Sequence, residues 1–399
     1  MKEVFLKKLF QLIFYLVFLS TFVFGGFFQL FLGVPNTLIT YFSVFLLAFF
    51  VFAYSVFTWK TILNKTVVLF LLFGLLILIS GIANGSGFIK TGLYFLFFLM
   101  PLSTYLFFRI NNKNDYISGY VLKKLFFLIA CLQLPIMVIQ KYSYPLLVHL
   151  NRSNQGIIEA DIMFGSFFLK ADHALGLFLL FNIFNIVLHN KNKEITKYPI
   201  LMYLYFGFTI LYAESNITKL VLVVFTAYSI YKLVPKKIKF LGILLAAVMF
   251  AVFINKIKEI RPVKNELIFI EKEYNTKKSY RNFERGIAKR PQVIISYATK
   301  IPPKIIGDGP YSYFNILKGE FKLTQHFSQI IWTYADLGII GIILFIILLF
   351  SLIKSLILPQ YMIVVIFSIM MIYSFMTTIF SDIAIMITVC GLLQIKSKY

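Results

Sequence analysis

The sequence predicts an all-α polytopic membrane protein with about twelve transmembrane helices and one large, partly helical extracytoplasmic loop. Of its 399 residues, 60% are apolar and only 14% are charged, whereas soluble domains have about 45–50% apolar and about 25% charged residues. The apolar residues gather in runs close to the roughly 20 residues that a helix needs to cross a bilayer. One long hydrophilic stretch, from about Asn255 to Gln325, interrupts these runs. A large soluble domain therefore has no room beside the predicted spans.

The apolar runs follow one another from the N-terminus. The first comes after Lys2, Lys7 and Lys8; it is too long for a signal peptide and lacks a small-residue cleavage site, so we expect a retained anchor. The last two runs meet around Phe380 and Asp382 and fit either two spans or one re-entrant hairpin. We expect an even number of crossings in total. The predicted runs are 9–31, 37–57, 66–84, 91–108, 120–140, 173–189, 198–213, 217–233, 239–254, 327–353, 361–380 and 383–395.

Positive charge is distributed unevenly between the two predicted sides of the membrane. With the N-terminus in the cytoplasm, 19 of the 39 Lys and Arg residues fall in inner segments, 5 in short outer segments, and 15 in the long hydrophilic stretch. The positive-inside rule favours this orientation, in which both termini are cytoplasmic, because long loops cross the membrane whatever their charge. The net charge of +23 is therefore divided by membrane sidedness, and we expect no nucleic-acid partner.

This orientation divides the chain into three parts. We expect an N-terminal bundle of about nine helices at 1–254, a large basic extracytoplasmic loop at 255–326, and about three C-terminal helices at 327–399.

Two observations argue against redox chemistry and ion-coupled transport. Cys131 and Cys390 both lie within apolar runs, so neither a disulfide framework nor a thiolate metal site is expected. The acidic residues near spans, Glu214 and Asp382, stand at predicted span ends, whereas an ion-coupled carrier normally holds carboxylates near the membrane midplane. We accordingly expect neither a cofactor nor a metal ion.

The predicted loop carries a charge of +8, from 15 basic and 7 acidic residues. The inner side of the membrane attracts basic residues, so topology does not explain this charge, and we expect an anionic ligand or anionic headgroups; a nonspecifically basic, solvated loop is the alternative. Arg281 and Arg285 share one face of a predicted helix at 279–288, and Arg290 precedes Pro291, which favours the first turn of a second helix. Guanidinium groups grip phosphate oxygens in a fork, so these arginines are phosphate candidates, with plain surface charge as the alternative.

His326 follows the loop at the predicted boundary between water and lipid. A neutral imidazole can take a proton from a sugar hydroxyl at ambient pH; the alternative role is a polar membrane anchor. Upstream, Gly307, Asp308, Gly309 and Pro310 predict a turn that redirects the chain. The turn is not a nucleotide-binding phosphate loop, because no Lys-Ser or Lys-Thr pair follows it.

Three stretches resemble the O-antigen polymerase and O-antigen ligase superfamily of polytopic glycosyltransferases. The first, FGSFFLKADHALGLFLL from Phe164, resembles an outer-face stretch of the family, with Asp172 and His173 where the family often has Asn. The second, ESNITKLVLVV from Glu214, resembles a span start that contains Ser-Arg, with Lys219 in the place of the Arg. The third, RPQVIISYATKIPPKIIGDG followed by TQHFSQIIWTYADLGIIG, resembles the family's order of Arg, helix, Pro, Gly-x-Gly, His and Leu-Gly-x-x-Gly.

The resemblance implies an enzyme of the bacterial cytoplasmic (inner) membrane that polymerises oligosaccharide repeat units of O-antigen (lipopolysaccharide) or capsule type. Glycan would pass from a polyprenyl-pyrophosphate-linked oligosaccharide to a lipid-linked acceptor on the outer face, with inversion and without metal. Membrane lipids and a chain-length-regulating protein are the implied partners. The implied sites are catalytic His326 and Arg290, with Gln325 or Ser328 as alternatives to His326; pyrophosphate-binding Lys219, Arg281, Arg285 and Arg290; and acceptor-binding Asp172, His173, Gln325 and Ser328.

Three other functions stay open at this point. A ligase that moves finished glycan to another acceptor has the same sequence features. A flippase or secondary transporter suits an even number of spans equally well, although the basic outer loop and the scarcity of midplane charge disfavour it. A non-enzymatic assembly partner is the third.

Overall fold

The computed structural model describes residues 2–58, 63–153, 155–157, 162–189, 195–213, 215–233, 302, 304–313 and 328–393. Within these ranges every regular element is a helix, which confirms the all-α class. Within the described residues, each predicted apolar run coincides with helix; the run 239–254 lies outside them, and of the predicted loop at 255–326 they include only 302 and 304–313. The elements are α1 Lys2–Phe18, the π-helix η1 Leu19–Val23, α2 Gly25–Leu32, α3 Asn36–Thr58, α4 Lys65–Ala83, α5 Phe88–Asn114, α6 Gly119–Tyr142, α7 Tyr144–Leu150, α8 Asp172–His189, α9 Pro199–Tyr212, α10 Asn216–Leu233, α16 Gln329–Lys354, α17 Gln360–Met376 and α18 Ile383–Leu393.

The described helices make this chain a membrane protein. Large apolar side chains on the outer faces, such as Phe52, Leu75 and Val223, keep more than half of their surface exposed, which water would penalise and lipid does not. The apolar stretches of α8, α9, α10, α17 and α18 are shorter, at 10–17 residues. Six helices among the described residues are long and apolar enough to cross a membrane: Lys2–Val23, Asn36–Thr58, Lys65–Ala83, Phe88–Asn114, Gly119–Tyr142 and Gln329–Lys354.

Two helices, α8 and α18, form the centre of the bundle. They pack against each other, and α18 also contacts α3, α5 and α6. Along α18 the side chains from Ile383 to Leu392 are buried, and those of α8 are buried from Ala174 to Ile186. A helix that is apolar on every side is expected in the interior. The short length of α18 is consistent with this central position.

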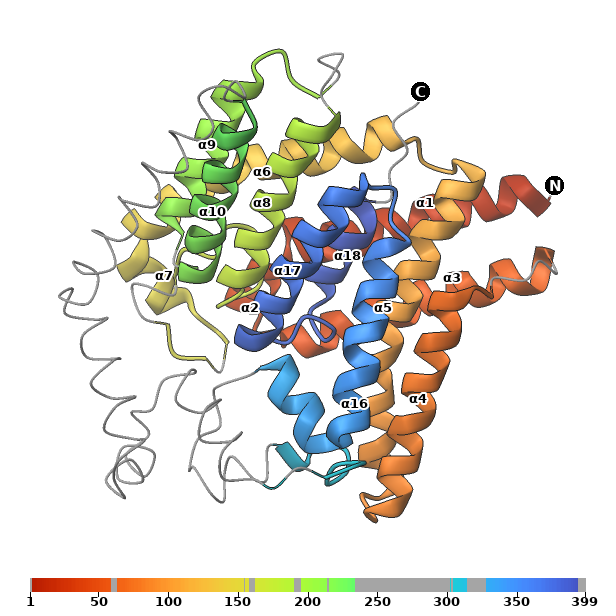
Figure 1. Cartoon of the computed structure of the whole chain (residues 1–399). Coiled ribbons are helices and arrows are strands. Elements are labelled where there is room, and N and C mark those ends of the chain that lie inside the picture. The colour runs from red at the N-terminus through yellow and green to blue at the C-terminus, as the bar shows by residue number, and fades with distance from the viewer. Residues whose placement is uncertain are drawn as a thin grey trace.

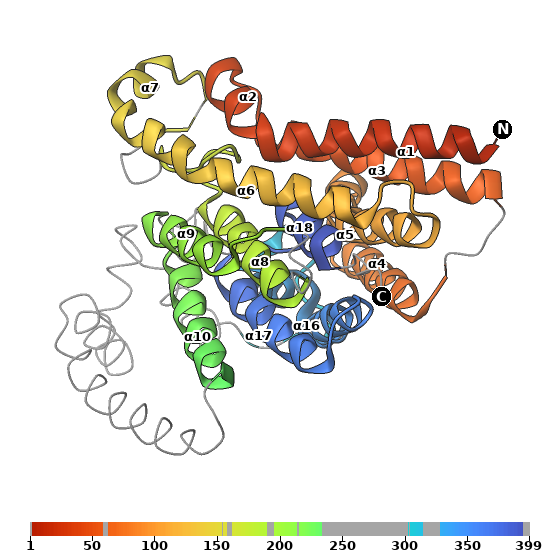
Figure 2. The ribbon, with the colours of Figure 1, turned by 90° about the horizontal axis from the view of Figure 1, so that it is seen from above.

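The helices run in two main directions. In Figure 1, α4, α5, α8, α10, α16 and α17 run roughly up and down, whereas α1, α3 and α6 run across the molecule. Figure 2, seen from above, shows α1, α3 and α6 lengthwise and several of the others nearly end on. The start of α8, the start of α10, the end of α17 and the connection between α4 and α5 all point toward the lower side of Figure 1. We call this side the lower end of the bundle.

The predicted first span, 9–31, is corrected by the structure. A helix does cover Lys2–Val23, but the chain bends at Phe24 and continues as the separate helix α2. Gly25 and Gly26 stand at the bend and let the segment that contains Phe167 approach closely. A Cβ atom on Gly26 would lie 2.4 Å from the carbonyl oxygen of Phe167. A straight apolar helix cannot make this contact, and the hydropathy of the run does not reveal it.

Candidate functional site

An irregular segment, residues 162–171, leads into α8 from within the bundle. The side-chain amide of Gln140 pairs with both backbone groups of Gly165, donating to its oxygen over 2.6 Å and accepting from its nitrogen over 2.9 Å. Gln133 accepts from the backbone nitrogen of Ser166 over 3.0 Å, and Gln29 accepts from that of Leu169 over 2.8 Å. Non-helical backbone inside a membrane protein needs such partners. These glutamines therefore fix the point at which α8 begins.

The first residues of α8 meet the start of α10 in a polar group that we call the His173 cluster. His173 Nδ1 lies 3.4 Å from Asp172 Oδ2 and 3.0 Å from Ser215 Oγ. Ser215 Oγ lies 2.7 Å from Thr218 Oγ1, which in turn hydrogen-bonds to the hydroxyl of Tyr373 on α17. The cluster thus joins three helices through Asp172, His173, Ser215, Thr218 and Tyr373.

Burial divides the His173 cluster into an inner and an outer part. Ser215, Thr218 and Tyr373 have no exposed surface, whereas the side chains of His173 and Asp172 keep 18% and 29% of theirs. Buried hydroxyls are stable only when they are hydrogen-bonded, which these three achieve within the cluster. The imidazole and the carboxylate therefore stand where a buried polar network reaches the lower end of the bundle.

Ser328 lies beside the same part of α17. Its hydroxyl donates to the carbonyl oxygen of Ser374 over 3.3 Å, and Ser374 directly follows Tyr373 of the His173 cluster. The Ser328 hydroxyl also caps α16 by accepting from the backbone nitrogen of Ile331 over 3.4 Å. Because Ser328 is 4% exposed, its hydroxyl is occupied by helix capping and by the contact with α17.

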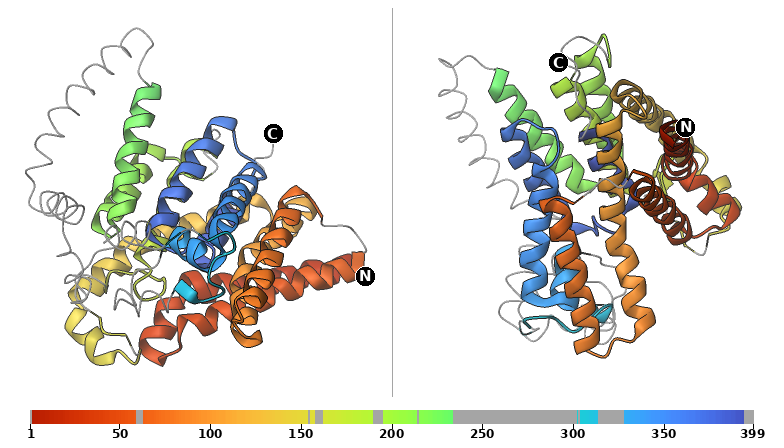
Figure 3. Two further views of the ribbon diagram at one scale, coloured as in Figure 1. Left: turned by 60° about the horizontal axis from the view of Figure 1, so that its bottom comes forward. Right: turned by 90° about the vertical axis from the view of Figure 1, so that its right-hand side faces the viewer.

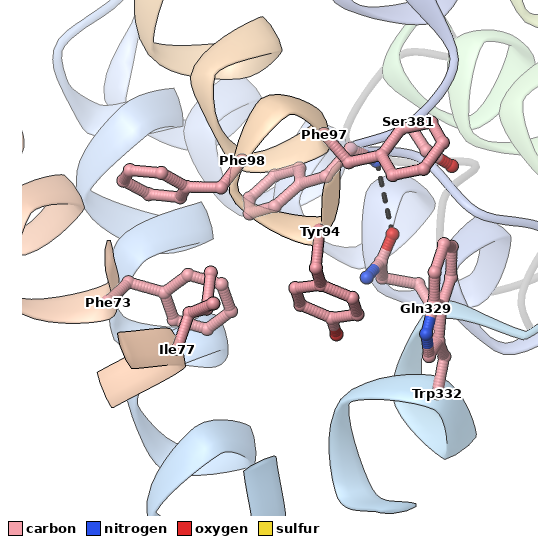
Figure 4. A pocket seen from close by; sticks show the side chains of 9 residues that line it. Phe73, Ile77, Tyr94, Phe97, Phe98, Gln329, Trp332 and Ser381 are labelled. Carbon is pink, nitrogen blue, oxygen red and sulfur yellow. Dashed lines mark hydrogen bonds between the residues drawn. The ribbon is translucent and has the colours of Figure 1, made fainter. Parts of the chain in front are cut away.

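Gln329, the next residue, holds the connection between α17 and α18. Its backbone nitrogen donates to the carbonyl oxygen of Thr377 over 3.1 Å. Its side-chain oxygen accepts from the backbone nitrogen of Phe380 over 3.2 Å, the dashed line in Figure 4. The start of α16 and the end of α17 are therefore tied together at two consecutive residues, 328 and 329.

An aromatic pocket opens beside Gln329. Figure 4 shows the ring of Tyr94 at its centre, with Phe97 and Phe98 from the same helix and Trp332 next to Gln329. Rings and an isoleucine make most of the wall, so the pocket suits an apolar or flat-faced group. The lining residues are Phe73, Ile77, Tyr94, Phe97, Phe98, Gln329, Trp332, Phe380 and Ser381.

Residues 304–313 of the predicted loop pack against a bend in α16. Gly338 adopts φ 69° and ψ −160° within α16, a backbone conformation that is essentially restricted to glycine. A Cβ atom there would lie 2.4 Å from the backbone nitrogen of Gly307 and 2.4 Å from the carbonyl oxygen of Lys304. The predicted turn at Gly307–Pro310 is thus packed directly against this bend. In Figure 3 (right) this cyan segment lies at the lower end of α4, α5 and α16.

Asp336 fastens this contact, and we call the arrangement of residues 304–313 on Asp336 and Gly338 the Asp336 clasp. The carboxylate accepts from the hydroxyl of Ser312 over 2.7 Å and from the backbone nitrogens of Tyr313 and Tyr311 over 2.8 and 3.1 Å. Its backbone oxygen accepts from the Ser80 hydroxyl over 2.8 Å. Burial raises the pKa of the Tyr311 phenol.

The structure describes four of the predicted site residues: Asp172, His173, Lys219 and Ser328. Asp172 and His173 lie together with the start of α10, and Lys219, half-buried, is in the first turn of that helix. Ser328 contacts Ser374, the residue after Tyr373 on α17, and its hydroxyl caps the start of α16. Outside the described residues are Arg281, Arg285, Arg290, Gln325 and His326, so the structure does not place the predicted arginines or the predicted base.

Several residues that build the site carry no distinctive sequence signal. Ser215 and Thr218 belong to a stretch that was singled out only for Lys219, and Tyr373 lies within an ordinary apolar run. A tyrosine at that position is indistinguishable by sequence from the many aromatic residues of the chain. Asp336 does carry a signal in the sequence, since a carboxylate inside a 26-residue apolar helix is costly without partners.

The fold and this site define a class: a helical membrane protein with a buried polar network that reaches one end of its bundle. No protein-family description, curated protein or solved structure matches the chain.

Proposed function

We propose that this protein is a glycosyltransferase that polymerises oligosaccharide repeat units carried on polyprenyl pyrophosphate. In this proposal it spans a bacterial cytoplasmic membrane about twelve times, with both termini in the cytoplasm and the lower end of the bundle on the outer face. The acceptor is a second lipid-linked unit, and no nucleotide sugar or metal takes part.

One observation carries the proposal. The three stretches that resemble the O-antigen polymerase and ligase superfamily are far apart in the sequence, yet parts of all three gather around the end of α17. His173 of the first contacts Ser215 of the second over 3.0 Å. Ser328 of the third contacts Ser374, the neighbour of Tyr373 in the His173 cluster.

The Asp336 clasp supports the same function. It joins the Gly-x-Gly part of the third stretch to its Leu-Gly part through the contact of Gly307 with Gly338. The described residues that flank Gln325 and His326 in the sequence, Tyr313 before them and Ser328 after them, are therefore both held at α16. Two such anchors suit a function in which charged groups are presented to a substrate at the lower end of the bundle.

Cations are the proposed means of stabilising the leaving group. As the glycosidic bond breaks, negative charge accumulates on the pyrophosphate, and positive groups positioned for that charge lower the barrier. Lys219 stands in the first turn of α10, where the positive end of the helix dipole adds to its own charge. Arg281, Arg285 and Arg290 are proposed to complete this grip.

The test is reconstitution of the purified protein in liposomes with polyprenyl-pyrophosphate-linked repeat units as the only glycan. We expect a ladder of longer lipid-linked glycans, which Arg290→Ala reduces and which Lys197→Gln, an exposed residue before α9, leaves intact. Glycan transfer only to an added, different acceptor would instead identify a ligase. Transbilayer movement of labelled lipid without any new glycosidic bond would overturn the proposal in favour of a flippase.

A further inference from the structure

We infer that Arg109 and Tyr105 bind the phosphate group of a membrane phospholipid, at the opposite end of the bundle from its lower end. The connection between α4 and α5 points toward the lower end in Figure 1, so the start of α4 and the end of α5 lie away from it. The inference does not depend on the proposed glycosyltransferase activity. It follows from the hydrogen bonds of two neighbouring side chains and from the charge around them.

The side chain of Tyr105 connects α5 to the start of α4. Asn64 caps α4, because its Oδ1 atom accepts from the backbone nitrogen of Val67 over 2.8 Å. This bond fixes the orientation of the amide, so the Nδ2 atom is the one that donates to the hydroxyl of Tyr105, over 2.8 Å. Arg109 Nη1 donates to the same hydroxyl over 2.9 Å. The oxygen of Tyr105 therefore accepts two hydrogen bonds.

The hydrogen of the Tyr105 hydroxyl has no acceptor among the residues that the structure describes. Both groups that contact its oxygen are donors, and neither can take this hydrogen. Tyr105 is 1% exposed, and its ring packs near that of Phe70, so bulk water does not supply the acceptor. A buried O–H without a partner is costly. An oxygen atom bound at the guanidinium of Arg109 would be close to this hydrogen, because Nη1 already contacts the hydroxyl.

Arg109 has unused hydrogen-bonding capacity in the same place. A guanidinium carries several N–H donors and no acceptor, and within the described part of the chain Arg109 makes one hydrogen bond, to Tyr105. No carboxylate of these residues lies within ion-pair distance of it. The side chain is partly buried, and a cation that has lost part of its hydration is stabilised by an anion that accepts its hydrogen bonds.

The charge around Arg109 also favours an anion. Lys65 is the first residue of α4 and is exposed at this end. Thr66 Oγ1, at the start of α4, lies 3.0 Å from Ser351 Oγ on α16, and Lys354 follows Ser351 by about one helical turn. Basic side chains thus come from α4 and from the two helices that it contacts, α5 and α16. The first turn of α4 adds the positive end of its helix dipole.

A phospholipid phosphate is the anion that fits these donors and this position. Its oxygens accept paired N–H bonds from a guanidinium and single bonds from a hydroxyl or an ammonium group. Exposed apolar side chains of the same part of α4, such as Leu63 and Val68, offer a surface to acyl chains. The positive-inside rule puts this end of the bundle at the cytoplasmic leaflet, which carries negative charge. An anionic lipid such as phosphatidylglycerol meets all of these conditions.

The test measures lipid binding by native mass spectrometry of the purified, delipidated protein in detergent. Phosphatidylglycerol is the probe, and diacylglycerol, which has the same acyl chains and no phosphate, is the headgroup control. We expect the wild-type protein to retain phosphatidylglycerol and not diacylglycerol. Arg109→Gln should weaken this binding by about 10-fold or more, as for loss of a charged hydrogen bond. Tyr105→Phe, which keeps the ring, should weaken it as well, whereas Lys124→Gln, an equal loss of charge at an exposed position of α6, should not.

A second measurement separates lost binding from a misfolded protein. A ligand that binds only the folded state raises the midpoint of thermal unfolding. Phosphatidylglycerol should therefore raise the midpoint of the wild-type protein and of Lys124→Gln, but not that of Arg109→Gln. Arg109→Lys should show a smaller rise, because an ammonium keeps the charge without the paired hydrogen bonds. The midpoints without lipid show that each variant is folded.

Three results would overturn the inference. Equal affinity of Arg109→Gln and the wild-type protein for phosphatidylglycerol would remove Arg109 from the site. Equal binding of diacylglycerol would show that acyl chains alone are held. Displacement of phosphatidylglycerol by inorganic phosphate at the same concentration would assign the site to a free anion instead of a lipid. None of these results bears on the ladder of glycans in the liposome assay, so the proposed function stands or fails separately.

Discussion

The carboxylate of Asp336 accepts a hydrogen bond of 2.8 Å from the backbone nitrogen of Tyr313, a residue of the predicted outer loop. Asp336 has no exposed surface and lies just before the bend of α16 at Gly338. A buried carboxylate is stable only with hydrogen-bond partners, and here the partners come from the chain segment that precedes α16 by a long connection. The conformation of residues 304–313 and the bend of α16 consequently depend on each other.

Replacing Asp336 with Asn should destabilise the protein by about 1–3 kcal/mol. The amide oxygen of Asn can still accept hydrogen bonds, but its NH₂ group then faces the backbone N–H of Tyr311 or Tyr313, and two donors repel. The midpoint of thermal unfolding of the purified protein in detergent measures this effect. Asp308→Asn is the matched control, because its contact with Lys304 is partly exposed and exposed ion pairs contribute about 0–1 kcal/mol. Equal midpoints for the two variants would contradict the role of Asp336.

Replacing Gly338 with Ala should cost about 3 kcal/mol or more, because the change combines an unfavourable backbone conformation with a steric clash. The added methyl would lie 2.4 Å from backbone atoms of Gly307 and Lys304, which cannot move aside as a flexible side chain can. Gly92→Ala is the control: Gly92 is in α5 with open space around a built Cβ, so this change should be neutral or slightly stabilising. Limited proteolysis of the two variants adds a local measurement, in which only Gly338→Ala should expose the 304–313 segment.

Replacing Gln140 with Met should leave both backbone groups of Gly165 unpaired in a buried site. Each lost partner costs about 1–3 kcal/mol, and Met fills a similar volume, so the loss reflects hydrogen bonding more than packing. We expect a lower unfolding midpoint and, because the segment leads directly into α8, a lower rate of glycan assembly. Gln360→Met, an exposed change at the start of α17, should alter neither quantity. A Gln140→Met protein of normal stability would show that the amide pairing is dispensable.

The sequence predicts the helices well because lipid imposes a simple rule: a membrane-crossing segment must satisfy its own backbone and present apolar side chains. The rule locates α3, α4, α6 and α8 to α10 almost to their ends, whereas α5 continues to Asn114, beyond its predicted end at residue 108. It fails at Gly26 and Gly338, where the chain bends because another segment approaches closely. Such bends depend on contacts between residues far apart in the sequence, which local hydropathy does not encode.

The candidate site was predictable to a similar degree. Asp172, His173 and Lys219 are site predictions because they stand at positions of the family resemblance, and the structure places them at adjacent helix starts. The hydroxyls of Ser215, Thr218 and Tyr373 were not singled out, because single hydroxyl residues are common in apolar helices and only their mutual distances give them a role. The sequence indicates the turn at Gly307–Pro310 and the Leu-Gly motif at Gly338. It does not predict that the two pack against each other, because a turn signal does not identify the segment that packs on the turn.

Lys219 provides a functional prediction that separates charge from geometry. If the side chain stabilises a pyrophosphate at the start of α10, Lys219→Gln should lower the rate of polymerisation by about 10-fold or more, as expected for loss of a charged contact of about 1.5–3 kcal/mol. Lys219→Arg should keep the wild-type rate or exceed it, because a guanidinium offers two parallel hydrogen bonds to phosphate oxygens where an ammonium offers a point charge.

The polymerisation rate in liposomes at low and high salt checks both expectations. The difference between the wild-type protein and Lys219→Gln should persist at high salt, since a half-buried contact is screened less than an exposed one. Lys197→Gln, exposed before α9, provides the baseline for a charge change elsewhere on the protein. A Lys219→Gln protein as fast as the Lys197→Gln protein would remove Lys219 from the proposed phosphate grip and leave that role to the arginines of the loop.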